Sequence, residues 1–93
     1  MFIARQLTVT ANGTYDLGKS PTDAYSYKID GTFGGGSVEI GYISRSGSFV
    51  AYTDITALTA NGQGVVTCGN GSSVAFKLAG ATTPTLYLQV NPA

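Results

Sequence analysis

The sequence predicts an all-β fold: a single antiparallel β-sandwich or jelly-roll-like domain of seven to eight short strands. Thirteen glycines and three prolines divide the 93 residues into short segments. Within these segments apolar and polar residues alternate, and this period of two is typical of strands that have one face on a core. No long window combines helical periodicity with helix caps. A chain of this length supports one domain.

The N-terminal half contains three expected strands. Residues 1–10 are expected to form an N-terminal arm or an edge strand, and residues 11–93 the β-sandwich domain. Alternation is clearest in residues 24–30 and 37–42. The apolar residues that carry these strands are Ile3, Leu7, Val9, Tyr25, Tyr27, Ile29, Val38, Ile40 and Tyr42.

The C-terminal half contains four more expected strands. Residues 48–55 and 64–68 are irregular strands, whereas residues 74–78 and 86–91 alternate regularly. Residues 54–60 are short and rich in β-branched residues, so they form at most one helical turn. The regular strands are expected to bury Val74, Phe76, Leu78, Leu86, Leu88 and Val90, and the irregular ones carry Phe49, Val50, Tyr52, Ile55, Val65, Val66 and Cys68.

Small and polar residues mark the turns. Ser46 and Gly47 are expected to close a hairpin, and the polar residues 19–23 to form an exposed loop. Residues 34–36, all glycine, indicate a corner between sheets or a close approach of another backbone. Asn-Gly pairs are typical of tight hairpin turns. They stand at residues 12–13, 61–62 and 70–71.

The composition argues against several partners. Five basic and five acidic residues balance to a net charge of zero, and charged residues make up only 11% of the chain. No run of like charge exists to hold phosphates or anionic lipid, so neither nucleic acid nor a membrane is an expected partner. The first residues lack the pattern of a signal peptide, and no segment is apolar for long enough to span a bilayer.

The same composition favours self-association. Cys68 is the one cysteine, so no internal disulfide forms, and there is no histidine. A short chain without such cross-links is stabilised only modestly by its own core. Few charges and no net charge leave a surface that tends to associate. We therefore expect part of this surface to be covered by a partner; the alternative is a monomer solvated by its polar uncharged residues.

Catalytic chemistry has little support. Without histidine, Cys68 or a serine would need another base beside it, and a buried structural thiol is the better interpretation of Cys68. The five acidic residues are scattered, which argues against a carboxylate pair and against a calcium site, and zinc clusters are absent. The glycine-rich residues 31–36 precede no helix, so they do not form a phosphate loop. The sequence predicts a protein that is not an enzyme, with no cofactor and no metal.

Tyrosine is the most informative residue type. Tyr25, Tyr27 and Tyr42 share faces with aliphatic residues, which indicates the core. Tyr15, Tyr52 and Tyr87 stand at positions able to face outward, where they are candidate interface aromatics. Outward tyrosines also stack on sugars or bases, and simple packing is the third interpretation of each.

Five segments carry a resemblance. Residues 29–38 read Ile-Asp-Gly-Thr-Phe-Gly-Gly-Gly-Ser-Val, residues 44–48 Ser-Arg-Ser-Gly-Ser, residues 58–62 Leu-Thr-Ala-Asn-Gly, residues 76–82 Phe-Lys-Leu-Ala-Gly-Ala-Thr and residues 85–90 Thr-Leu-Tyr-Leu-Gln-Val. Over about two-thirds of its length the chain thus resembles a family of short phage-encoded virion proteins. Similar proteins often have Asp-Gly-Gly and then Thr-Trp at the hairpin, where this chain has Ser46, Gly47, Ser48 and Phe49.

The resemblance implies a small β-sandwich or jelly-roll component of a phage particle, assembled in the host cytoplasm. Its most plausible role is that of a capsid decoration or cement protein, a homotrimer that stabilises the head by binding the major capsid protein or other virion proteins. The alternative is a carbohydrate- or receptor-binding module of a tail or fibre, which predicts two or more coplanar aromatic residues on one concave face. The candidate docking arm comprises Phe2, Ile3, Arg5 and Leu7, because an unpaired strand adds to an exposed sheet edge.

Overall fold

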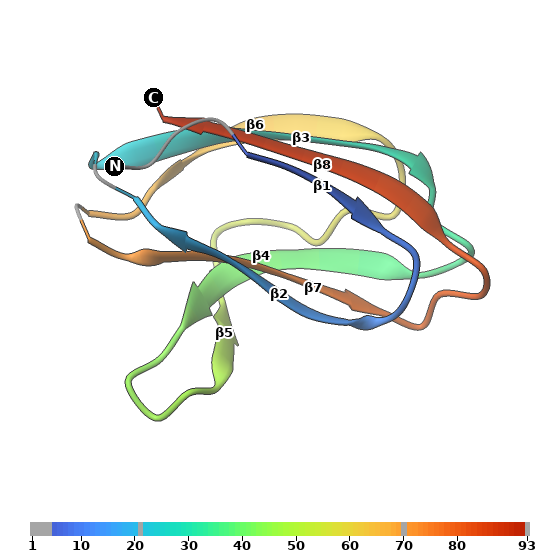
Figure 1. Ribbon diagram of the computed structural model, residues 1–93, viewed down its shortest axis with the longest axis horizontal. Coiled ribbons are helices and arrows are strands. Elements are labelled where there is room, and N and C mark those ends of the chain that lie inside the picture. The colour runs from blue at the N-terminus through green and yellow to red at the C-terminus, as the bar shows by residue number, and fades with distance from the viewer. Residues whose placement is uncertain (1–4, 21, 70, 93) are drawn as a thin grey trace.

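Two four-stranded antiparallel sheets, packed face to face, make up the described part of the chain, residues 5–20, 22–69 and 71–92 of a computed structural model (Figure 1). The strands are β1 (Arg5–Val9), β2 (Gly13–Lys19), β3 (Ala24–Thr32), β4 (Ser37–Ile43), β5 (Phe49–Ala51), β6 (Gly62–Thr67), β7 (Ser73–Ala79) and β8 (Thr85–Pro92). The predicted all-β sandwich is confirmed.

The strand order is that of a jelly roll. Sheet A has the order β1-β8-β3-β6, and sheet B has the order β2-β7-β4-β5. Every strand passes the chain to the other sheet except β4, which pairs with β5 directly. Two interlocked Greek keys of this kind characterise the eight-stranded jelly roll.

The core fills the space between the sheets, and period-two alternation selects its residues. Tyr25, Tyr27 and Ile29 of β3 are buried as predicted. They face β7, where Phe76 meets Tyr27 edge-on with ring centroids 6.2 Å apart. The other buried residues that the alternation predicted are Val38, Ile40, Val74, Leu78, Leu86, Leu88 and Val90. Val9 and Val66, from strands predicted as irregular, are also buried, whereas Tyr42, predicted to point inward, is half-buried.

The sequence analysis did not predict strand β2. β2 has two inward residues, the half-buried Tyr15 and the buried Leu17. Its pairing with β7 shifts register between Asp16 and Lys19, and Gly18 within that interval has a φ of +99°. The irregularity breaks the alternation after two apolar residues, which is too short a pattern to predict a strand.

The Asn-Gly pairs do not close hairpins, which corrects the sequence prediction for two of them. Asn12 lies between β1 and β2, and Asn61 precedes β6; both connections cross from one sheet to the other. The Asn12 amide donates to the carbonyl of Ala81 at 3.0 Å and accepts from its N–H at 2.9 Å, while Asn61 Oδ1 accepts from the N–H of Gly31 at 3.1 Å. Asn12 thus holds the β1–β2 connection against the β7–β8 connection, and Asn61 holds the start of β6 against β3. The third pair includes Asn70, which lies outside the described residues.

The other turn predictions have mixed outcomes. Ser44 and Ser48 close the β4–β5 hairpin around Gly47, as expected. Gly34 begins the corner from β3 to β4, and its carbonyl accepts from the N–H of Thr82 at 2.9 Å, so this corner is also a close backbone approach. The expected exposed loop at residues 19–23 is wrong at Ser20. Ser20 is 1% exposed, and its burial is compensated by hydrogen bonds: its N–H donates to the Ser72 carbonyl and its hydroxyl to the Thr22 carbonyl.

The Tyr25 hydroxyl stands out among the buried polar groups of the described residues because it makes no hydrogen bond. Tyr25 is fully buried, and its hydroxyl has no hydrogen-bond partner within the described residues. Burial raises the pKa of Tyr25, and the nearby Tyr52, Cys68 and Tyr27 raise it further. Burial also raises the pKa of Tyr27 and of Tyr52. The folded state therefore holds these three phenols in the neutral form.

We predict that Gly34→Ala destabilises the fold far more than Gly35→Ala. Both glycines have positive φ, 62° and 79°, so a side chain costs about 1–2 kcal/mol at either. A Cβ at Gly34 would also lie 2.1 Å from the Thr82 carbonyl oxygen, whereas one at Gly35 meets nothing within 4 Å. Urea unfolding should show a loss of more than about 3 kcal/mol for the first variant and about 1 kcal/mol for the second. Equal losses would contradict the close approach at this corner.

A second prediction concerns tyrosine hydroxyls. At neutral pH, Tyr25→Phe should leave the free energy of unfolding unchanged or raise it by about 1 kcal/mol, since an unpaired buried hydroxyl is removed. Tyr15→Phe should lower it by about 1 kcal/mol, because the Tyr15 hydroxyl donates to the Ala11 carbonyl.

Above about pH 10 the unfolded chain releases phenol protons that the folded chain retains, so stability falls as pH rises. Tyr25→Phe should make that fall less steep; an unchanged slope in pH-dependent urea unfolding would refute the assignment.

Candidate functional site

The three candidate interface tyrosines lie on separate surfaces. Tyr87 stands on the outer face of β8 and is 53% exposed. Tyr15 is half-buried on β2 in the other sheet. Tyr52 follows β5, is half-buried and packs against Tyr42 with ring centroids 5.5 Å apart. The sequence predicted that all three stand at positions able to face outward, and of the three Tyr87 alone is exposed.

The candidate docking arm is partly within the fold. Phe2 and Ile3 lie outside the described residues. Arg5 and Leu7 belong to β1, where they pair with Val90 and Leu88 of β8. Arg5 is exposed, with its guanidinium beside Gly18 of β2, and Leu7 is half-buried against the core.

β1 also forms one edge of sheet A. Its pairing with β8 occupies one side of the strand, and among the described residues no strand pairs with the other side. The edge strand of sheet B on the same side of the sandwich is β2 (Figure 1). Between β1 and β2 lies a recess of about 460 Å³ that is lined by Leu7, Tyr15 and Leu17 among other residues. An exposed strand edge is a ready template for another strand.

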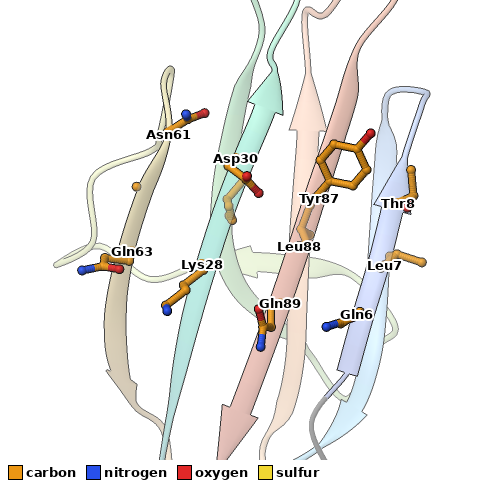
Figure 2. Close-up of a pocket in the computed structure, with 12 residues that line it drawn as sticks. Gln6, Leu7, Thr8, Lys28, Asp30, Asn61, Gln63, Tyr87, Leu88 and Gln89 are labelled. Carbon is orange, nitrogen blue, oxygen red and sulfur yellow. The ribbon is translucent and has the colours of Figure 1, made fainter.

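The outer face of sheet A carries a larger hollow of about 850 Å³, which sequence reasoning did not find. Figure 2 shows that its side chains come from all four strands and from the turn before β6. The strand register places them in two rows, since residues paired across strands point to the same face. One row runs Thr8, Tyr87, Asp30, and the next runs Gln6, Gln89, Lys28, Gln63. Asn61 completes the first row at the β6 end (Figure 2).

Most polar groups in this hollow have unused hydrogen-bonding capacity. Within the part of the chain that the structure describes, Asn61 is the one hydrogen-bonded side chain in these rows, and its bond to Gly31 fixes its place beside β3. Lys28 and Asp30 are exposed and lie two residues apart on β3. The hollow therefore presents amides, a hydroxyl, one cation, one anion and one aromatic ring to a ligand.

The remaining residues with nucleophilic or metal-binding side chains do not cluster in the described part of the chain. Cys68 is a free, half-buried cysteine just beyond β6, packed against the core. Asp16 and Asp30 stand in different sheets. Across the described ranges no group of three or more potential ligand side chains forms a metal site. In the same residues, no helix has the length and apolarity needed to cross a membrane.

Comparisons with known proteins bear on the fold. No known protein family matches the chain, and no curated protein sequence does. The crystal structure of SPBc2 prophage-derived protein YomS matches with a TM-score of 0.61 at 15% identity, covering 98% of this chain and 96% of that one. The solution structure of a de novo designed double-stranded β-helix matches with a TM-score of 0.54 at 11% identity, covering 97% of each chain. The chain therefore has a jelly-roll fold that resembles, over nearly its whole length, that of a prophage-derived protein.

Proposed function

We propose that this chain is a structural protein of a bacteriophage virion, a capsid decoration or cement protein that stabilises the head from its outer surface. The observation that carries the proposal is the likeness in fold to the prophage-derived YomS across 98% of the chain. The motifs of residues 29–90, which resemble short virion proteins, point to the same class. This role requires no catalytic group and no cofactor.

The edge of β1 is the proposed docking element. Strand addition at this edge uses backbone N–H and C=O groups, so it needs no charge complementarity and suits a chain with 11% charged residues. Leu7 and Tyr15 border the recess beside the edge, where an incoming strand would find apolar surface for an alternate side chain. Phe2 and Ile3, which lie outside the described residues, belong to the same proposed docking arm.

The β4–β5 hairpin supplies a second surface, which we assign to contacts between copies. It extends away from the body of the sandwich (Figure 1). Its apolar side chains are incompletely covered: Phe49 is half-buried, and Val50 is 36% exposed. In the proposed homotrimer, neighbouring copies would bury these side chains and add hydrophobic stabilisation that a short chain lacks.

A tail or fibre module that binds a carbohydrate or receptor is the second candidate. The hollow around Tyr87 favours it, because that face offers a ring and many hydrogen-bonding groups. The separation of Tyr15, Tyr52 and Tyr87 argues against the form of this hypothesis that needs several coplanar tyrosines.

We predict that particles of the encoding phage carry the protein in symmetric positions on the head. Electron cryo-microscopy of purified particles should show density of this size on the capsid lattice, with mass spectrometry confirming the chain. Copies found solely at the tail or fibre, or particles without the protein, would refute the decoration role.

Reconstitution tests the arm separately. Phe2→Ser combined with Ile3→Ser should lower occupancy on heads that lack the protein by about tenfold or more, if these residues anchor the contact. Val65→Ser is the matched control, because Val65 is an exposed apolar residue, 64% accessible, on the opposite edge strand β6. Equal occupancy for both variants would exclude the arm as the docking element.

A further inference from the structure

The hollow on sheet A is electrically balanced. Lys28 and Asp30 are the two charged residues among those that line it, and they carry opposite signs. A site for phosphate, nucleic acid or an anionic polymer needs an excess of positive charge, which this face does not have. Its ligand is therefore expected to carry no net charge.

Amide groups dominate the polar lining. Gln6, Gln89 and Gln63 lie in one row across the sheet, with Lys28 between the last two. Asn61 stands at the β6 end of the next row. Each amide offers two N–H donors and a carbonyl acceptor. A sugar hydroxyl is likewise both donor and acceptor, so neighbouring hydroxyls of a saccharide match a row of amides. Neighbouring strands are about 4.8 Å apart, which sets a regular spacing along the row.

Tyr87 gives the hollow an exposed aromatic surface. Its ring is flanked in the same row by Thr8 on β1 and Asp30 on β3 (Figure 2). An exposed ring beside a hydroxyl and a carboxylate is suited to the C–H face of a pyranose with its hydroxyls directed outward. The centre of a protein–protein interface is typically rich in apolar and aromatic residues, whereas Tyr87 is the single aromatic residue of this hollow.

We propose that this hollow binds a neutral oligosaccharide, with a sugar ring stacked on Tyr87 and hydroxyls bonded to Asp30 and to the glutamine row. The inference names the ligand class of the second candidate function, and it does not rest on the decoration role, because the side chains of this face are distinct from the backbone edge proposed for docking. A glycan site here would give a particle that displays many copies a multivalent attachment to a polysaccharide surface.

Heteronuclear NMR titration of the purified chain tests the site. The probes are neutral linear hexasaccharides of glucose, xylose and N-acetylglucosamine at millimolar concentration, with heparin as the anionic comparison. At least one neutral probe should shift the side-chain amide signals of Gln6, Gln63 and Gln89, and heparin should not. Tyr87→Ala should weaken that binding about tenfold or more, while Tyr87→Phe keeps the ring and most of the affinity.

Control variants distinguish a loss of ligand binding from a loss of folding. Thr14→Ala with Lys77→Ala alters a directly paired, exposed couple on sheet B and should leave binding unchanged. Gln89→Ala replaces Tyr87→Ala if the latter loses its dispersed amide spectrum. The proposal is overturned if no neutral probe shifts these signals, if heparin shifts them equally, or if they shift with protein concentration alone, which would assign the face to a second copy. Such a result would leave the head location of the protein a separate question, answered by microscopy of particles.

Discussion

The packing of the inner faces of the two sheets is the interaction on which the rest of the molecule depends. Within the described residues the chain has neither a disulfide nor a metal cluster to join the sheets. Tyr27 of sheet A meets Phe76 of sheet B at the centre of this layer. All but one connection between successive strands crosses from sheet to sheet, so the inner layer is built from strands that are far apart in each sheet's own order along the chain. The hydrogen bonds of Asn12 and the approach of Gly34 to Thr82 hold two of those crossings.

This dependence explains how much of the fold could be predicted. Alternation is local, and it identified the inward-facing residues of β3, β7 and β8 correctly. It missed Ala75 of β7, which is buried although it lies on the other face of the strand. β2 was missed because its alternation stops at the irregularity before Lys19. The Asn-Gly pairs were assigned to hairpins because these residues favour a tight turn in either case: when the turn joins two strands of one sheet, and when it joins strands of different sheets. The partner that distinguishes them, Ala81 for Asn12, is 69 residues away.

The candidate site was harder to predict than the core. Gln6, Lys28, Gln63 and Gln89 are neighbours only because β1, β8, β3 and β6 pair in this order and register. Register in a sheet is set by which residues are buried, so it is a property of the whole fold and not of a segment. Sequence reasoning placed Tyr87 at an outward position, and the structure adds the row in which it stands. It also separates Tyr87 from Tyr15 and Tyr52, which alternation alone cannot do.

The core and the hollow are nevertheless two consequences of one register. Burial of Leu86, Leu88 and Val90 forces Tyr87 and Gln89 outward, because side chains alternate between faces. The outer residues can then vary without disturbing the inner layer, which leaves that face open to functional specialisation. β1 links the two proposed surfaces: its side chains Gln6 and Thr8 line the hollow, while its outer backbone edge is the proposed site of strand addition. A strand added there would continue sheet A and place its own side chains beside Gln6 and Thr8. Docking at the edge would therefore extend this face of sheet A beyond β1 and leave the two rows around Tyr87 in place.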